Sequence, residues 1–293
     1  MVIANIIGGL GNQMFQYAAA RALALRKSVP LKLDISGFNS YGLHQGFELV
    51  NVFKIDTDFA ESEDVRKMLG LQSQPLILRM LSRPEFVVLR SRKLVIEPSF
   101  NYSEMINEVP DDCYLKGYWQ TEKYFLDTSA LLRKDFTFRQ PLENKNAECA
   151  TLISELNAVS LHVRRGDYVR DASTAKKHGL CSVQYYHDAV QLVAERVPNV
   201  HLFVFSDDIF WVKKNLPLDL PTTFIDHNHG AESFNDMRLM CMCKHHIIAN
   251  SSFSWWSAWL NPRADKIVIA PNSWFNIGNY NTRDLYCPGW VIL

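Results

Sequence analysis

The second half of the chain alternates between two kinds of apolar pattern. Short runs of apolar and β-branched residues, as in 158–163 and 201–205, are typical of buried strands. Between these runs apolar residues recur every three to four positions, as in 183–196, which predicts helices. The other expected elements are strands at 222–225, 246–249 and 267–270 and helices at 147–156, 209–215, 232–243 and 254–260. Strands that alternate with helices predict a parallel, doubly wound sheet.

The first half shows this alternation only at its start. A glycine-rich turn at 8–11 separates an expected strand from an expected helix, and a second strand completes a βαβ unit. The expected elements are strands at 2–7 and 31–34 and helices at 12–26, 62–69 and 75–81. We expect the first half to be Rossmann-like too.

A polar stretch with a proline, 135–146, separates the two patterns. A chain of 293 residues is long enough for two domains of ordinary size. We therefore expect an α/β protein with domains at 1–146 and 147–293.

The composition excludes several classes of protein. The 31 basic residues balance the 31 acidic ones, so no overall positive field is available to hold nucleic acid. No window approaches the ~20 apolar residues of a membrane span, and the first residues lack a basic leader. We expect a cytoplasmic protein without a transmembrane segment. The cysteines are expected to be free, and the spacing of Cys241, Cys243, His245 and His246 fits no standard zinc site.

The most informative segment is His162 to Tyr168, directly after an expected strand. Its two adjacent arginines, Arg164 and Arg165, present planar forks that match a diphosphate. Ligands of open α/β sheets bind at this edge. The alternative is an ordinary ion pair with Asp167 or Asp171.

Polar residues also follow the other strands of the second half. Asn250 to Ser254 begins a helix, and its hydroxyls and N–H groups could cap that helix or bind a phosphate. Ser251 is thus a candidate for both roles. Asp207 and Asp208, after the strand that ends at Phe205, could recognise a base or ribose or cap the next helix. Arginines and a serine-rich helix start at one edge together predict a nucleotide-diphosphate site.

Three other motifs suggest rival functions. The turn Gly8 to Met14 lacks the third glycine of a dinucleotide fingerprint, which argues against a dehydrogenase. Asp56-Thr57-Asp58 has the spacing of a metal-using sugar transferase, but its place before an expected helix favours capping. Arg165-Gly166-Asp167 matches an adhesion tripeptide, which recurs by chance.

Several segments in chain order resemble glycosyltransferase family 11, the α-1,2-fucosyltransferases. They are Gly8 to Ala18, Tyr114 to Gln120, His162 to Tyr168, Phe205 to Asp208 and Asn250 to Trp256. The resemblance implies a GT-B fold, in which two Rossmann-like domains face each other across a cleft. It also implies that the second domain holds GDP-fucose, that a galactose-ended glycan enters from the first, and that no metal or other cofactor takes part.

The resemblance assigns roles by motif position. Arg164 and Arg165 would hold the diphosphate, with Ser252 and the N–H of Phe253 completing the phosphate site. His162 would lie near the guanine, and Asn12 would face the fucose. Asp236 matches a guanine-binding acid of related α-1,6-fucosyltransferases.

The implied reaction is an inverting transfer of fucose to the 2-hydroxyl of a terminal galactose. Arg164 would neutralise the charge on the departing GDP, and Asp167 is the candidate base, unless it only pairs with an arginine. A different linkage, or another nucleotide-sugar transfer, is the alternative. A peripheral position at the inner face of the membrane is a second option for localisation. Tyr118 and Trp119 could stack on a sugar or belong to the core.

Overall fold

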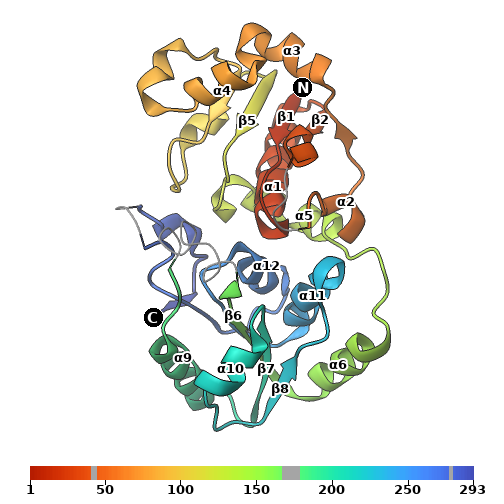
Figure 1. The fold of residues 1–293 in the computed structure, drawn as a ribbon, viewed down its shortest axis with the longest axis vertical. Coiled ribbons are helices and arrows are strands. Elements are labelled where there is room, and N and C mark those ends of the chain that lie inside the picture. Colours follow the sequence, from red (N-terminus) through yellow and green to blue (C-terminus); the bar gives the residue numbers. More distant parts are fainter. Residues whose placement is uncertain (41–44, 167–178, 277–279) are drawn as a thin grey trace. The chain divides into compact units, whose positions relative to one another are not determined.

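The computed structural model describes residues 1–40, 45–166, 179–276 and 280–293 (Figure 1). It divides into two compact units. The first unit comprises Met1–Arg139 and Asn281–Leu285, and the second comprises Gln140–Tyr280 and Tyr286–Leu293. The boundary expected after residue 146 falls inside α6 (Asn144–Glu155), because the polar stretch taken for a linker includes the first turn of that helix.

The first unit is built on a parallel sheet. Its described strands are β1 (Val2–Asn5), β2 (Leu31–Asp34), β3 (Asp58–Phe59), β4 (Leu94–Ile96) and β5 (Cys113–Lys116). They lie in the order β3-β2-β1-β5-β4. β1 thus has β2 on one side and β5 on the other, and the order changes direction between β1 and β5.

Helices and 3-10 turns connect these strands. The α-helices are α1 (Leu10–Lys27), α2 (Leu49–Val52), α3 (Ser62–Leu69), α4 (Pro75–Leu81) and α5 (Ser129–Asp135). Prominent 3-10 turns are η2 (Gly70–Ser73) and η3 (Pro84–Leu89), on either side of α4. α1 is almost wholly buried over its first four turns because small side chains, including Ala18, Ala19 and Ala20, bring it close to the sheet.

The second unit contains a larger parallel sheet. Its described strands are β6 (Asn157–Val163), β7 (Val200–Ser206), β8 (Thr222–Ile225), β9 (His245–Ile247), β10 (Val268–Ala270) and β11 (Val291–Ile292). Their order is β11-β10-β9-β6-β7-β8. Counted along the chain, this is the 3-2-1-4-5-6 order of the Rossmann fold.

Helices cover both faces of this sheet. They are α6, α9 (Val183–Arg196), α10 (Ile209–Asn215), α11 (Phe234–Met242) and α12 (Ser252–Leu260). On one face α9 and α10 pack on odd-numbered residues of β6, such as Val159 and Leu161. On the other face α6 and α11 pack on Ala158 and Phe203. Alternate residues of β6 therefore point toward different helices.

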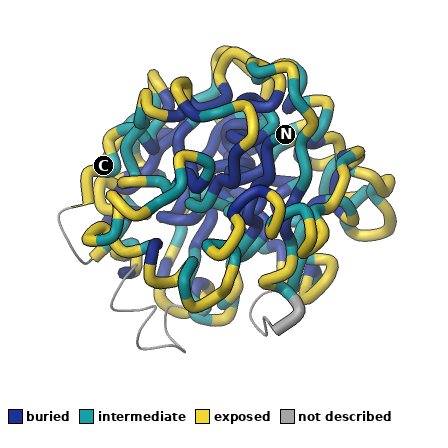
Figure 2. The backbone as a smooth tube through the Cα atoms, turned by 90° about the horizontal axis from the view of Figure 1, so that it is seen from above, coloured by how far each residue is buried: buried dark blue, intermediate teal, exposed yellow. Residues whose placement is uncertain are grey.

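The core follows the sheets. The chain inside the molecule is mostly dark blue in Figure 2, whereas turns and loops at the surface are mostly yellow, and the short β3 is exposed. The six cysteines are free, as expected. The part of the chain that the structure describes has no helix long and apolar enough to cross a bilayer.

The structure confirms the α/β fold class and adds elements that the sequence pattern missed. β3, β4, β5, β11, α2 and α5 were not predicted. Most of these are only two to four residues long, so the apolar alternation is too brief to identify them. The four short strands, β3, β4, β5 and β11, are strands because they pair with neighbouring strands.

Candidate active site

The arginine turn and the serine-rich turn lie at one edge of the second sheet. β6 and β9 are neighbours, with Leu161 paired to Ile247. His162 lies near the end of β6, Arg164 to Gly166 follow the strand, and Asn250 to Ser254 follow β9. This is the point where the strand order reverses, and open α/β sheets bind ligands at the carboxyl ends of the strands there. The structure therefore brings together the two segments that the sequence singled out.

Asp207, at the end of β7, organises the arginine turn. Its Oδ1 accepts the backbone N–H of Arg165 at 2.8 Å, and its Oδ2 lies 3.0 Å from Nη1 of Arg164. A Cβ on Gly166 would lie 2.9 Å from the same carboxylate, so the glycine allows this close approach. From the sequence, Asp207 was expected together with Asp208 to recognise a base or ribose or to cap α10, not to hold the arginine turn. This contact could not be predicted from the sequence, because it depends on the pairing of β7 with β6.

The two arginine side chains have different surroundings. The guanidinium of Arg165 stacks on the indole of Trp211, 3.7 Å from the ring centroid, and its Nε lies 3.8 Å from Asp208. Asp208 is the N-cap of α10 and accepts the N–H of Trp211 at 3.1 Å, so the capping prediction is confirmed. Arg164 instead raises the positive potential around His162. Arg164 thus pairs with Asp207 and lies near enough to His162 to lower its pKa, whereas Arg165 packs on α10.

His162 is buried near the beginning of α12. Its ring centroid lies 6.0 Å from that of Phe253. Burial and the charge of Arg164 lower the pKa of His162 to about 3, so its imidazole is neutral. Nδ1 of this ring is buried and has no hydrogen-bond partner among the described residues. Buried polar atoms are usually satisfied, so this nitrogen marks a place where a ligand can bind.

The beginning of α12 has an uncharged cap, which already binds the N–H of Phe253 that was expected at the phosphate. Ser251 is the N-cap, and its hydroxyl accepts the N–H of Phe253 at 3.3 Å. The first turn contains no acidic residue. Asn250 fixes the preceding turn by donating to the carbonyls of Gly179 and Trp274, each at 3.3 Å. The positive end of this helix, with Ser252 in its first turn, is suited to a phosphate.

Asp236 lies in a polar network at the first turn of α11. Its Oδ1 accepts from Nδ2 of Asn228 at 2.8 Å, and Asn228 also contacts Asn146 and through it His227. Burial raises the pKa of Asp236 to about 7, despite the hydrogen bond from Asn228. This half-buried carboxylate, with one amide partner, keeps acceptor capacity for a ligand N–H.

The first unit has a comparable edge between β1 and β5. Asn12, in the first turn of α1, accepts a hydrogen bond from Nε2 of Gln120 at 2.7 Å. The N-terminus of α1 is occupied by the carboxylate of Glu48, which accepts the N–H of Leu10. Burial raises the pKa of Glu48 to about 7. A dinucleotide would place its pyrophosphate at this helix start, so Glu48 is a structural argument against a dehydrogenase.

Glu97, which follows β4, was not noticed in the sequence. Its two oxygens accept the backbone N–H groups of Tyr118 and Trp119, at 2.6 and 2.9 Å. A Cβ on Gly117 would lie 2.8 Å from Oε2 of Glu97. Trp119 is held at φ 57°, an uncommon conformation for a bulky residue. The loop that follows β5 is therefore fixed by the end of β4.

The aromatic residues of this loop separate into two environments. Trp119 is buried and packs edge-on against Tyr124, with ring centroids 5.2 Å apart, so it belongs to the core. Tyr118 is partly exposed and stacks with Phe100. Tyr118 is the member of the pair that a ligand can reach.

The metal-related motif has another explanation. Asp58 begins β3, and the helix that follows is capped by Glu61, so the capping interpretation of Asp56-Thr57-Asp58 was wrong. Among the described residues no three His, Cys, Asp or Glu side chains form a group able to hold a metal ion. His246 is bound by Ser160 and Asn261, and Nδ1 of His245 accepts the N–H of Ile267.

Asp167, the candidate base, lies outside the described residues, and so does the end of the adhesion tripeptide.

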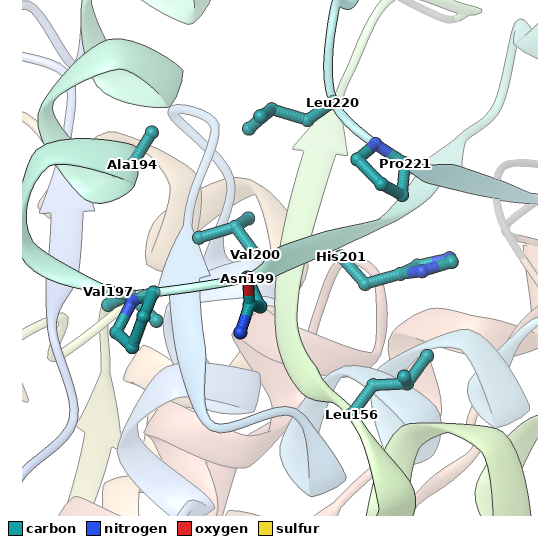
Figure 3. Close-up of a pocket in the computed structure, with 9 residues that line it drawn as sticks. Leu156, Ala194, Val197, Asn199, Val200, His201, Leu220 and Pro221 are labelled. Atoms are coloured by element: carbon teal, nitrogen blue, oxygen red, sulfur yellow. The ribbon is translucent and has the colours of Figure 1, made fainter.

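A surface pocket of about 410 Å³ lies at the amino end of β7 (Figure 3). Val200 and His201 line it together with Leu220 and Pro221, and the lining is mainly apolar. The candidate site lies at the carboxyl ends of the strands, so this pocket is not part of it.

Comparison with known proteins decides the family. The model of glycosyl transferase family 11 matches residues 98–293, which include every candidate site residue of the second unit. The chain belongs to glycosyl transferase family 11.

Two relatives from Escherichia coli match this chain along almost the whole length of both proteins. An alpha-1,2-colitosyltransferase of Escherichia coli is 39% identical over 99% of this chain and 98% of its own. The O-antigen biosynthesis glycosyltransferase WbnK of Escherichia coli is 34% identical over 98% of each chain. A galactoside 2-alpha-L-fucosyltransferase of Mus musculus, Sec1, is 29% identical over 45% of this chain and 37% of its own.

The fold is that of known fucosyltransferases. The crystal structure of the NodZ alpha-1,6-fucosyltransferase soaked with GDP-fucose covers 92% of this chain and 94% of its own, with a TM-score of 0.54 and 16% identity. The predicted GT-B fold of this glycosyltransferase is thereby confirmed.

Proposed function

We propose that this glycosyltransferase transfers L-fucose from GDP-β-L-fucose to the 2-hydroxyl of a terminal galactose, with inversion at the fucose C1 and without a metal. The observation that carries the proposal is the edge between β6 and β9. There Arg164 and a helix start without acidic residues are close in the fold, at the place where Rossmann-like sheets bind nucleotides.

The donor diphosphate would lie between Arg164 and the first turn of α12. Its negative charge is met by a guanidinium and by N–H groups at the positive end of the helix. Arg165, stacked on Trp211, would support the turn from its other side. The guanine would hydrogen-bond to Nδ1 of His162, which has no partner among the described residues, and to the carboxylate of Asp236, which can accept a further hydrogen bond.

The reaction then depends on charge at the leaving group. As the bond to C1 breaks through an oxocarbenium-like transition state, negative charge grows on the departing GDP. A fixed cation aimed at that charge stabilises the transition state more than the ground state. Arg164 is the proposed cation. Asp167 remains the candidate base that removes the proton of the acceptor hydroxyl.

The first unit would bind the acceptor. Its edge offers the amide of Gln120 and the partly exposed ring of Tyr118, while Asn12, which is hydrogen-bonded to Gln120, would face the fucose. Amides hydrogen-bond sugar hydroxyls and aromatic rings pack on the apolar faces of sugars, whereas a phosphate would meet the carboxylate of Glu48. This set of groups suits a neutral sugar.

A second candidate donor follows from the 39% identical relative, which is named as an alpha-1,2-colitosyltransferase. Colitose is fucose without its 3-hydroxyl. A site built to hydrogen-bond that hydroxyl would reject the colitose donor about 10⁴-fold, whereas a pocket without such a group would discriminate by only about 10².

The experiment is an assay of the purified protein with GDP-fucose or GDP-colitose and a panel of glycans ending in galactose, with and without EDTA. NMR of the product gives the linkage and the anomeric configuration. We expect an α-1,2-linked product with GDP-fucose and unchanged turnover in EDTA. A β-linked product, another linkage or loss of turnover in EDTA would refute the corresponding part of the proposal, and preference for GDP-colitose would establish the second candidate.

A further inference from the structure

α4 is apolar on two opposite faces. Ile77, Leu78 and Leu81 pack into the core of the first unit. On the other side Leu76 is 82% exposed and Met80 is 38% exposed, one helical turn apart. A helix at the surface of a water-soluble domain usually presents polar residues on its outer face.

The turns on either side of α4 continue this apolar surface. Leu71 in η2 is 80% exposed, and in η3 Val88 is 86% exposed beside Val87 and Leu89, which are also exposed. Phe86 points into the core instead. Thus six of the large exposed apolar side chains of the described chain lie within 71–89: Leu71, Leu76, Met80, Val87, Val88 and Leu89.

Hydrogen bonds hold these turns together as one surface. The side chain of Gln72 donates to the carbonyl of Leu89 and accepts the N–H of Ser91, each at 2.9 Å. The guanidinium of Arg90 donates to the carbonyls of Leu81 and Arg83. We call the segment 70–93, which is mostly orange in Figure 1 and includes α4, the α4 surface.

The α4 surface is basic within a chain of zero net charge. It contains Arg79, Arg83, Arg90, Arg92 and Lys93 against the single acid Glu85, which is five positive charges and one negative. Arg79, Arg83 and Arg92 are exposed among the apolar residues. Exposed apolar side chains mixed with arginines are the composition of segments that lie in the interface of a bilayer.

We propose that the α4 surface docks the protein on an anionic lipid bilayer. Leu71, Leu76 and Val88 enter the boundary between headgroups and acyl chains, and the arginines contact the lipid phosphates. The short α4 and its flanking turns suit shallow insertion, because no segment here has the length of a span. The positive charge of the α4 surface favours an anionic membrane as its partner. Two copies of the chain that met through their α4 surfaces would repel each other.

The test is flotation of the purified full chain with vesicles of phosphatidylcholine, with and without about 30% phosphatidylglycerol. We expect binding to the anionic vesicles that weakens at about 0.5 M salt. The L76S/V88S variant should bind about tenfold less tightly, since both side chains lose apolar burial. R79Q/R83Q/R92Q should lose about fivefold for each charge.

Matched controls replace exposed residues elsewhere. L126S/L152S removes two exposed leucines and K145Q/K213Q/R263Q removes three exposed basic charges. These controls should bind like the wild type. All variants should keep their melting temperature and their turnover of a water-soluble acceptor, which separates docking from folding and from the proposed reaction.

Three outcomes would overturn the proposal. They are equal binding to neutral and anionic vesicles, equal losses in the test and control variants, and a stable oligomer that L76S/V88S dissociates. The last would assign the α4 surface to contacts between protein copies.

Discussion

The edges of the two sheets share one structural device. In each, a glycine after one strand lets a carboxylate from the end of the neighbouring strand approach the backbone. Gly117 and Glu97 form this contact in the first unit, and Gly166 and Asp207 form it in the second. Glu97 accepts two backbone N–H groups next to its glycine, and Asp207 accepts one. We call this the glycine–carboxylate contact.

The two edges differ in the charge that they leave for a ligand. In the first unit the contact fixes aromatic residues, and Glu48 occupies the N-terminus of α1. In the second unit it fixes two arginines, and the cap of α12 is the uncharged Ser251. The same βαβ plan thus gives one edge suited to a neutral sugar and one suited to an anion. A helix N-terminus such as that of α1 is therefore not a phosphate site when a carboxylate of the protein, here Glu48, already occupies it.

The largest effect is expected at the edge of the second sheet, where we propose that the donor binds. Arg164→Ala should lower turnover by about 10² to 10³, or ~3 to 4 kcal/mol, because the leaving diphosphate loses its cation. Arg164→Lys should restore little, since it lacks the planar fork. Steady-state kinetics with saturating acceptor measures both. Arg263→Ala, an exposed arginine paired with Asp265, is the control, and near-normal turnover of Arg164→Ala would contradict the assignment.

Alanine at the two glycines should separate the edges. Gly166→Ala and Gly117→Ala each place a methyl group within 3 Å of a carboxylate oxygen, so each should destabilise the protein by about 1 to 3 kcal/mol. Gly166→Ala should also weaken GDP binding, whereas Gly117→Ala should raise the KM of the acceptor. Denaturant unfolding, calorimetric titration with GDP and acceptor kinetics measure these effects. Weaker GDP binding in both variants would show that the edges do not have separate ligands.

The pH dependence of stability should report the buried carboxylate of Glu48. Its pKa is raised from 4.5 to about 7, because burial penalises the charged form in the fold. Its contribution to stability is present below pH 4.5 and is lost as the pH rises through about 7. Glu48→Gln cannot ionise, so its free energy of unfolding should fall less over this range, by on the order of 2 kcal/mol. Denaturant unfolding across this pH range, with Glu108→Gln as control, measures the difference, and parallel profiles would disprove the assignment.

A smaller effect is expected at the edge of the first sheet, where we propose that the acceptor binds. Glu97→Gln keeps the size of the side chain but replaces one acceptor oxygen with an NH₂ donor. The backbone N–H of Tyr118 or of Trp119 then loses its acceptor. The loop should then shift and the KM of the acceptor should rise about tenfold, as for the loss of one charged hydrogen bond. The Kd for GDP should stay the same. A changed Kd with an unchanged acceptor KM would reverse the roles of the two edges.

The sequence was sufficient for the second unit because its elements are long or strongly patterned. The bounds of α9, α10 and β8 match those expected from apolar periodicity. The alternation of strands and helices predicted a parallel sheet. In a parallel sheet the arginine turn and the serine-rich turn, which both follow strands, lie at the same edge. In the first unit β4 and β5 have three and four residues, and their strand conformation depends on pairing with each other and with β1. Such pairing is tertiary information.

The organising carboxylates could not be assigned from the sequence for a related reason. Glu97 and Asp207 act on backbone groups of a neighbouring strand, and Glu48 acts on a helix start far away in the sequence. The only local signal is an acid directly after a strand, which also fits a helix cap such as Asp208. Strand order must be known before the glycine–carboxylate contact can be found.

The most direct test of the central claim is a crystal structure with GDP bound. We predict the diphosphate at the first turn of α12, with the guanidinium of Arg164 on its oxygens and the guanine near His162 and Asp236. A nucleotide bound at the N-terminus of α1, or one that does not contact Arg164, would contradict the account.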